Sequence, residues 1–417
     1  MSKELEYLPI TDLLTKIIDN RGKSVPTVDK GFPLIATNCI KQSSIYPTFD
    51  KVRYIDETTL KSWFRAHLKP NDILFVNKGT PGRVCLVPNP VTFCAAQDMM
   101  GFRCNPDLIN YKYLFAVLRS KEIQKKIENN HVGLVIPHFR KQELSSLLIP
   151  LKSLHEQELI GNLYITLSEK IELNNRINSE LEAIAKTLYD YWFVQFDFPD
   201  ENGRPYKSSG GKMVWNKELK RKIPEDWLVK TIGDYAEVKK GDLITAKDAH
   251  NGEIKVIAAG VDFSYKHNEY NRLENTITIS GSGANAGYIN FWREPIFASD
   301  CITVRGANDA ETLLILHYLK FIQHHILGQA TGSAQPHVYP SDIKILNYIV
   351  PIGSLIKQFG NLVIPMNKQI AVNLKENQQL SSLRDWLLPM LMNGQVKVKD
   401  TVEETLLIAA EKKVEFQ

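Results

Sequence analysis

The chain has 417 residues, 43% of them hydrophobic and 24% charged, which is enough apolar material for two or three domains of ordinary size. Lys and Arg exceed Asp and Glu by only four, so affinity for nucleic acid would depend on where the positive charges lie. The five cysteines include no C-x-x-C pair, the first residues include no apolar signal core, and no apolar run is long enough to span a membrane. We therefore expect a cytoplasmic protein with no membrane partner.

The chain contains an internal repeat whose copies lie about 200 residues apart. A Gly-x-x-x-Pro-His motif, a glycine-rich segment, an aspartate and an apolar run closed by proline occur in the same order in both copies. The matched pairs are 133–138 with 332–337, 79–82 with 281–287, Asp98 with Asp300, and Pro150 with Pro351. An ordered series at a nearly constant offset predicts two similar globular half-molecules, each of mixed α and β structure.

Each half ends in a segment with the spacing of a long helix. Apolar or seam residues recur in steps of three and four from Ile160 to Tyr191, and again from Ile356 to Met390 with one phase slip near Leu380. Each helix would be about 54 Å long at roughly 1.5 Å per residue. Pro365 should kink or interrupt the first turns of the second helix. We predict an antiparallel coiled coil; the alternative is two amphipathic helices that each cover their own domain.

A polar residue occupies the middle of each predicted seam. These residues are Asn174 and Asn373. If a pseudo-two-fold axis relates the repeats, the two asparagines meet near that axis and fix the register of the helices. The alternative is that both side chains are solvated.

These patterns give an α/β (α+β) fold in which two similar globular domains are separated by two long antiparallel helices. The predicted segments are a first domain at 1–154, a first spacer helix at 155–195, a connector loop at 196–222, a second domain at 223–353, a second spacer helix at 354–393 and a C-terminal tail at 394–417.

Several segments resemble the specificity subunit of type I restriction-modification enzymes. They read YWFVQF at 191–196, GRPYKSSGG at 203–211, IPEDW at 223–227 and LLPML at 387–391, beside the two Gly-x-x-x-Pro-His motifs. The resemblance covers nearly the whole chain; Pro365 and the charged tail 397–417 depart from the family pattern.

The resemblance implies that each domain reads one half of an asymmetric, bipartite site in double-stranded DNA. It also implies that the helices set the spacer and bind two modification subunits, which methylate adenine from S-adenosylmethionine. A restriction subunit, which uses ATP and Mg²⁺, would join them, and none of these cofactors would bind to this chain. Half-site centres about one helical turn apart, roughly 34–36 Å or more, would let both readers enter the major groove.

Loop residues are the natural readers of base edges, with Arg or Lys directed to guanine and Asn or Gln to adenine. The candidate DNA-binding residues are Lys78, Arg83, His138, Arg140 and Lys141 in the first domain, and Lys239, Lys240, Asn285, His337 and Tyr339 in the second. Each could instead be a turn or surface residue without a role in binding. The connector carries six basic residues and one acidic residue between Lys207 and Lys222, which could be a solvated face or could touch phosphate.

Aromatic and apolar residues at the ends of the two helices are candidates for the subunit interface. They are Tyr191, Trp192, Phe193, Phe196, Trp386 and Leu387, each of which could equally close the local core.

The motifs of a lone restriction or modification enzyme are missing. Residues 22–24 (GKS) resemble the end of a P-loop, but Ile17 stands where its first glycine belongs, and no Asn-Pro-Pro-aromatic tetrapeptide occurs. No H-E-x-x-H or Cys/His spacing suggests a metal site. We therefore expect a non-catalytic binding subunit. A scaffold without sequence readout and, less favoured, a self-contained methyltransferase or nuclease are the alternatives.

Overall fold

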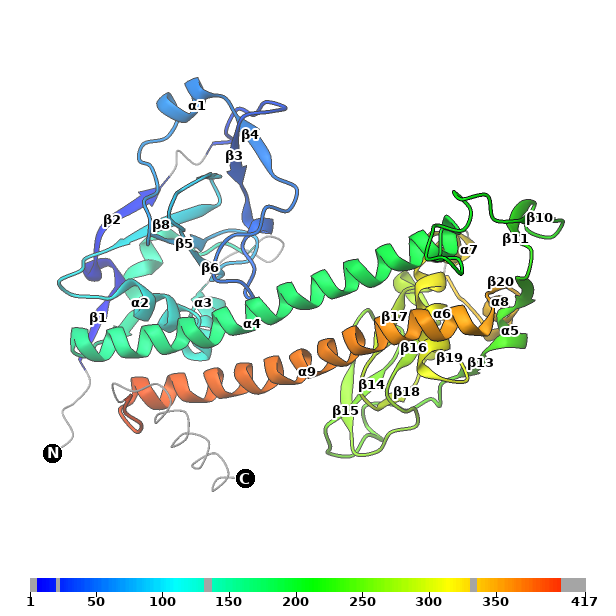
Figure 1. The fold of residues 1–417 in the computed structure, drawn as a ribbon. Helices are drawn as coiled ribbons and strands as arrows, with labels where there is room; N and C mark the ends of the chain where they lie inside the picture. Colours follow the sequence, from blue (N-terminus) through cyan, green and yellow to red (C-terminus); the bar gives the residue numbers. More distant parts are fainter. Residues whose placement is uncertain (1–5, 20–22, 131–136, 331–335, 399–417) are drawn as a thin grey trace. The chain divides into compact units, whose positions relative to one another are not determined.

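The computed structural model describes residues 6–19, 23–130, 137–330 and 336–398. The chain divides into two compact units, one formed by 1–175 with 375–417 and the other by 176–374. Each unit therefore combines one globular part with a portion of the two long helices, α4 (Leu154–Tyr189) and α9 (Gly353–Met392) (Figure 1). The sequence-based division treated the helices as separate segments, whereas the compact units cut across both of them.

The globular part of the first unit is built on three small sheets. The antiparallel four-stranded sheet has the strand order β2-β8-β5-β6 (Leu14–Asp19, Met99–Cys104, Ile73–Val76, Val84–Leu86). The three-stranded sheet has the order β4-β3-β7 (Arg53–Ile55, Phe32–Ile35, Cys94–Ala95). The third sheet is the pair β1-β9 (Tyr7–Pro9, Leu148–Pro150). The helices are α1 (Glu57–Ser62), α2 (Tyr111–Leu118) and α3 (Lys121–Asn130), with 3₁₀ turns η1 (Ile10–Leu13), η2 (Thr37–Cys39) and η3 (Lys141–Ser146).

Apolar runs bounded by polar caps explain these elements. All four residues of β5 are buried, as expected of a strand covered on both faces. The helix α2 begins at Asn110, whose side-chain oxygen accepts hydrogen bonds from the amides of Lys112 and Tyr113. In Figure 1, α2 lies between the strands and the N-terminal part of α4, and the rings of Phe115 and Tyr164 meet edge to face there at 6.1 Å. This layer forms the core of the first unit.

The second unit repeats the three sheets in the same strand order. They are β13-β19-β16-β17 (Glu237–Lys240, Cys301–Arg305, Thr276–Ser280, Ile289–Trp292), β15-β14-β18 (Tyr265–His267, Ile254–Ile257, Ile296–Ala298) and β12-β20 (Leu228–Thr231, Asn347–Val350). The helices are α5 (Ile232–Tyr235), α6 (Asp309–Phe321), α7 (Gln323–Ala330) and α8 (Pro340–Lys344), with a 3₁₀ turn η5 (Gly283–Asn285). The predicted repeat of two similar α/β domains is therefore confirmed.

One element of the second unit lies where the sequence predicted a loop. The connector folds into a two-stranded hairpin, β10 (Met213–Asn216) with β11 (Arg221–Pro224). The run of Gly and Lys around it concealed the short alternation that marks a strand pair.

The portions of α4 and α9 within each unit run antiparallel. In the first unit, Ser168 accepts from Arg384 at 3.4 Å and Lys170 pairs with Glu376 at 3.4 Å, so later positions of α4 meet earlier positions of α9. In the second unit, Asn178 meets Asn373, and the rings of Trp192 and Phe359 lie 6.2 Å apart. The predicted antiparallel pairing of the two helices therefore holds within each unit.

The buried stripe of α4 does not keep the predicted phase. After Asn174 it continues through Asn178, Ala185 and Tyr189, whereas the predicted seam residues Ile177, Ile184 and Tyr191 are exposed by 37%, 49% and 39%. An α-helix has 3.6 residues per turn, so a strict seven-residue pattern drifts around its surface by about 20° per heptad. The drift changes which of two neighbouring apolar stripes faces the core.

Pro365 does not interrupt α9, which runs unbroken from Gly353 to Met392. The prediction of an interruption was wrong because Pro365 lies on the solvent side of the helix. The carbonyl that loses its helical partner there belongs to Asn361, which is also exposed and can be hydrated.

The candidate interface residues at the helix ends are divided by burial. Trp192, Phe193, Phe196 and Leu387 are exposed by 7% or less and belong to the cores of their own units. These four close the local core, the alternative that the sequence left open. Tyr191 is exposed and Trp386 is partly buried, so they remain the surface members of the set. Within the described ranges, no helix combines the length and the apolar character needed to cross a membrane.

Candidate nucleic-acid interface

The candidate DNA-binding residues gather at one end of each four-stranded sheet. In the first unit, β2 and β5 end there and β8 and β6 begin there, because neighbouring strands are antiparallel. In the second unit, β13 and β16 end and β19 and β17 begin at the corresponding place. We call these places the loop edges of the two units; they bring together segments that are far apart in the sequence.

At the first loop edge, the glycine-rich turn pairs with the Pro-His segment. The amide of Gly79 donates to the Pro137 carbonyl at 2.9 Å, and the amide of Phe139 donates to the Asn77 carbonyl at 2.8 Å. Between these bonds, Lys78 and His138 form an isolated β-bridge. The Asn77 side-chain nitrogen lies 3.3 Å from His138 Nε2.

The second loop edge has the same main-chain frame. The amide of Gly283 donates to the Pro336 carbonyl at 3.1 Å, and the amide of Val338 donates to the Gly281 carbonyl at 3.0 Å. Ser282 and His337 form the β-bridge between them. The two repeated motifs of each half therefore form one structure. The first four residues of each Gly-x-x-x-Pro-His motif, 133–136 and 332–335, lie outside the described residues.

An aspartate holds each turn from the neighbouring strand. The Asp98 carbonyl accepts from the Asn77 amide at 3.1 Å, and the Asp300 carboxylate accepts from the Ser282 hydroxyl at 2.7 Å. The contact in the second unit uses the aspartate side chain, whereas the contact in the first unit uses the main-chain carbonyl, which any residue could supply at position 98.

The glycines at the turns are required by backbone conformation. Gly79 and Gly283 have φ angles of +86° and +74°, and a Cβ added at either position would meet no atom within 4 Å. Other residues rarely adopt such angles, whereas glycine does so without steric cost. The turns therefore leave open space above a fixed main chain.

The basic candidates of the first unit surround this turn. Lys78 and Arg140 are exposed and Arg83 is half-buried, whereas Lys141 is exposed beside Asp19, with 3.4 Å between its ammonium and the carboxylate. Exposed pairs of this kind contribute about 0–1 kcal/mol to stability. The Lys141 ammonium could therefore leave Asp19 and bind a phosphate with little loss of folding free energy.

The candidates of the second unit are chemically different. Asn285 is exposed on η5, and the rings of His337 and Tyr339 stack at 6.0 Å with an angle of 12°. Tyr339 is 58% exposed. Lys240 ends β13 at the loop edge, whereas the Lys239 ammonium lies 2.7 Å from the Glu237 carboxylate and is partly neutralised.

Two amides at the first loop edge were missed by the sequence reasoning. Asn77 and Gln97 are partly buried, and their side-chain oxygens have no hydrogen-bond partner among the described residues. Both oxygens are shielded from solvent, so either amide could pair with adenine only after its side chain turned outward. Their signal was weak: Asn77 follows an apolar run and Gln97 precedes Asp98, and only the fold brings them together.

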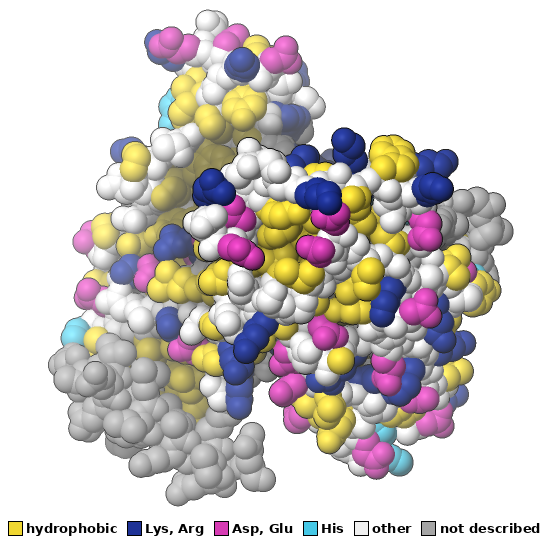
Figure 2. Space-filling model, turned by 45° about the vertical axis from the view of Figure 1, so that its right-hand side comes forward, with side chains coloured by type: hydrophobic (Ala, Val, Ile, Leu, Met, Phe, Trp, Pro, Cys, Tyr) yellow, Lys and Arg dark blue, Asp and Glu magenta, His cyan; other side chains and the backbone are white. Residues whose placement is uncertain are grey.

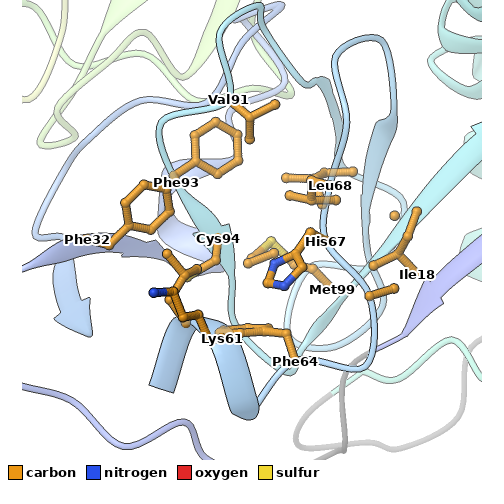
Figure 3. A pocket seen from close by; sticks show the side chains of 15 residues that line it. Ile18, Phe32, Lys61, Phe64, His67, Leu68, Val91, Phe93, Cys94 and Met99 are labelled. Atoms are coloured by element: carbon orange, nitrogen blue, oxygen red, sulfur yellow. The ribbon is translucent and has the colours of Figure 1, made fainter. Parts of the chain in front are cut away.

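A cavity of about 320 Å³ lies elsewhere in the first unit. Its lining is largely apolar, with Phe32, Phe93 and Leu68 around the space and His67 and Lys61 as its polar members (Figure 3). None of the candidate DNA-binding residues lines it.

Three of the cysteine thiols are held in their neutral form. Burial raises the pKa of the Cys94, Cys104 and Cys301 thiols to about 12. Among the described residues, no group of three or more His, Cys, Asp and Glu side chains could hold a metal ion. What the loop edges offer is hydrogen-bonding and positively charged groups on a rigid frame.

Comparison with known proteins identifies the family. A model of the type I restriction modification DNA specificity domain matches residues 8–183 and again residues 224–376. The chain is 26% identical over 374 residues to the type I restriction enzyme MjaIX specificity subunit of Methanocaldococcus jannaschii, covering 84% of this chain and 83% of the relative. It is 23% identical over 407 residues to the HindI specificity subunit of Haemophilus influenzae, covering 79% and 87%.

A solved structure has a similar fold. The S subunit of a type I restriction-modification system from M. genitalium aligns with a TM-score of 0.57 at 19% identity, over 96% of this chain and 98% of that chain. The two matched domains, the repeated loop edges and the two long helices together identify the chain as a member of the family of type I restriction-modification DNA specificity subunits.

Proposed function

We propose that this chain gives a type I restriction-modification complex its DNA sequence specificity, with each loop edge reading one half of an asymmetric bipartite site. The observation that carries this proposal is the duplicated main-chain frame. Each unit has its own four-stranded sheet with the same strand order. The corresponding strands lead into the turn Asn77-Lys78-Gly79 in one unit and Gly281-Ser282-Gly283 in the other, and each turn pairs with the Pro-His segment in the same way. A frame that stays constant while its side chains differ suits two readers of different sequences.

The chemistry of the exposed groups fits base reading in the major groove. The first loop edge carries Lys78, Arg83 and Arg140, which match the acceptors of guanine, and the second carries Asn285, which matches adenine. Each well-placed pair discriminates by about 1–3 kcal/mol, so a few contacts in each half suffice. Because the two sets differ, the two half-sites should differ as well.

The long helices offer a surface for partner subunits. Ile177 and Ile184 follow one another at an interval of seven along α4, and Tyr191 follows in the π-helical turn Asp190–Val194; all three are exposed. An apolar stripe with this spacing suits a second helix packed along it. In this proposal, two modification subunits dock on the helical region, and the helices set the spacer between the half-sites.

Catalysis belongs to the partners in this proposal. The modification subunits would bind S-adenosylmethionine and methylate adenine, and a restriction subunit would bring ATP and Mg²⁺. This chain would contribute recognition and assembly.

Co-expression with the modification subunits tests the proposal. Mapping of methylated adenines should give one asymmetric motif in two parts, absent when this chain is omitted. The double substitution Lys78→Ala with Arg140→Ala should relax one half of the motif and leave the other half unchanged. Methylation without a defined motif, or methylation by this chain alone, would contradict the proposal.

A further inference from the structure

The hairpin β10–β11 in the second unit carries exposed basic and aromatic side chains that base reading at the loop edges does not use. Cross-strand pairing places Trp215 opposite Lys222 and Val214 opposite Ile223. Successive side chains of a strand point to opposite faces, so Trp215 and Lys222 share one face, and Ile223 and Arg221 lie on the other.

The inner face fixes the hairpin to the rest of the unit. Ile223 is 2% exposed, the Arg221 guanidinium lies 4.7 Å from the centre of the Phe196 ring, and one of its nitrogens donates to the Val194 carbonyl at 3.2 Å. At the base of the hairpin, Lys212 pairs with Glu225 at 2.5 Å. The anchored hairpin can therefore present its outer face in one orientation.

The outer face is left to solvent. Trp215 is 61% exposed, and Lys222 is exposed beside it. Lys217 and Lys220 extend from the turn, which the Asn216 side-chain oxygen holds by accepting from the amides of Glu218 and Leu219 at 3.0 and 2.9 Å. In the described part of the chain, no carboxylate forms an ion pair with Lys217, Lys220 or Lys222. Figure 2 turns this side forward and shows Lys and Arg side chains along its upper part, with Asp, Glu and apolar side chains among them.

This combination suits an anionic polymer. Trp215 presents a large amphipathic ring to solvent on an anchored hairpin, with Lys222 opposite it and Lys217 and Lys220 in the adjoining turn. Lysine binds phosphate as a point charge without reading bases, and the indole N–H can donate to phosphate oxygen.

We propose that the outer face of the β10–β11 hairpin binds the phosphodiester backbone of duplex DNA independently of sequence. The inference rests on the proposed function, because it concerns the same DNA. It adds a contact that contributes affinity and position without contributing specificity.

The test uses this chain in complex with its modification subunits. The double variant K217Q/K222Q is compared with wild type and with the control K230Q/K357Q, which removes two exposed lysines from the same unit. Binding to a cognate duplex and to a scrambled duplex is measured across a salt series. Because each lost phosphate contact reduces the slope of log Kobs against log salt by about 0.9, we expect a reduction of about 1.8 and roughly tenfold weaker binding to both duplexes. The methylated motif should stay the same.

The second variant, Trp215→Ala, should weaken binding to both duplexes equally. Unchanged affinity and slope in K217Q/K222Q, while the wild-type complex still binds its motif, would overturn this inference and leave the proposed function intact. A wild-type complex without sequence preference would instead contradict the proposed function. Loss of the modification subunits from the variant, with an unchanged salt slope, would show that the hairpin faces protein and would also overturn the inference.

Discussion

Asn174 on α4 donates a 2.9 Å hydrogen bond from its side chain to the side-chain oxygen of Asn377 on α9. Four residues later on α4 and four residues earlier on α9, the Asn373 side chain donates to Asn178 at 2.8 Å. Each asparagine that the sequence singled out therefore has its partner inside its own unit, four positions from the one expected. That these asparagines fix the register stays a prediction.

Substitution of Asn174 tests this role. Asn174 is 1% exposed, and its side chain also donates to Glu376 at 2.7 Å, so Asn174→Ala removes two hydrogen bonds from a buried position. We expect a loss of about 1–3 kcal/mol in the free energy of unfolding, measured in urea. The double variant N174L/N377L should recover stability, because an apolar pair replaces both polar partners.

The same double variant separates stability from register. A polar seam residue specifies alignment at a cost in stability, so N174L/N377L should be stable but less selective for spacer length in methylation mapping. The control is Gln379→Ala at an exposed position of α9, which should change neither quantity. A double variant with an unaltered preference for one spacer would argue against a register role.

The turn glycines give a second prediction. Gly79→Ala and Gly283→Ala introduce no steric overlap, but each forces alanine to a positive φ, at a cost of about 1 kcal/mol. Because these turns carry the loop edges, each variant should reduce methylation that depends on one half-site. Gly203→Ala is the matched control, since Gly203 has a φ of +74° and equally open space but lies in the connector. It should lose similar stability while its methylation pattern stays intact; equal effects of all three on the motif would exclude a local role of the turns.

Repetition made the fold predictable to a large extent. The buried runs of β5 and β16 and the capped helices that follow them carry strong local signals, and each signal occurs twice. The boundaries of α4 and α9 fell within one or two residues of the predicted spacer helices, apart from the final turn Asp190–Val194, which is a π-helix.

The features that the sequence could not predict depend on tertiary packing. Ile177 and Asn178 both continue a helical pattern from Asn174, and only packing decides which of them is buried. Likewise, the partnership of Asn77 with His138 joins residues that no local pattern connects. The candidate DNA-binding residues could therefore be selected from their residue type and motif. Their assembly at the two loop edges could be recognised only from the three-dimensional fold.

The stability of the second unit should depend on pH because of His317. Its ring stacks on Tyr189 at 5.5 Å and meets Phe359 edge to face, and burial lowers its pKa to about 4, with Lys320, Lys186 and Arg293 adding to the effect and Asp190 opposing it. The unfolded chain takes up a proton below about pH 6.5, whereas the folded chain stays neutral down to about pH 4. Stability should therefore fall as the pH falls through this window, by about 2 kcal/mol from this group at pH 5.

The variant His317→Phe keeps an aromatic ring in place and removes the titrating group. Thermal unfolding at pH 7.5 and pH 5 should show a smaller difference between the two pH values in this variant than in wild type. His155→Gln, at an exposed position, is the control and should keep the wild-type difference. A pH difference that is equal in all three proteins would exclude His317 as its source.

The exposed stripe of α4 gives the last prediction. Ile184 is 49% exposed, so Ile184→Lys should change the stability of the free chain by no more than about 0.5 kcal/mol. In a helix-to-helix contact, the same charge would be buried without a partner, which costs far more. We therefore expect this variant to lose co-purification with the modification subunits while it keeps its unfolding temperature. Ser179→Lys places the same charge on another exposed position of the helix and should retain the partners. If Ile184→Lys assembles as well as Ser179→Lys does, the docking surface lies elsewhere and the stripe has no part in assembly.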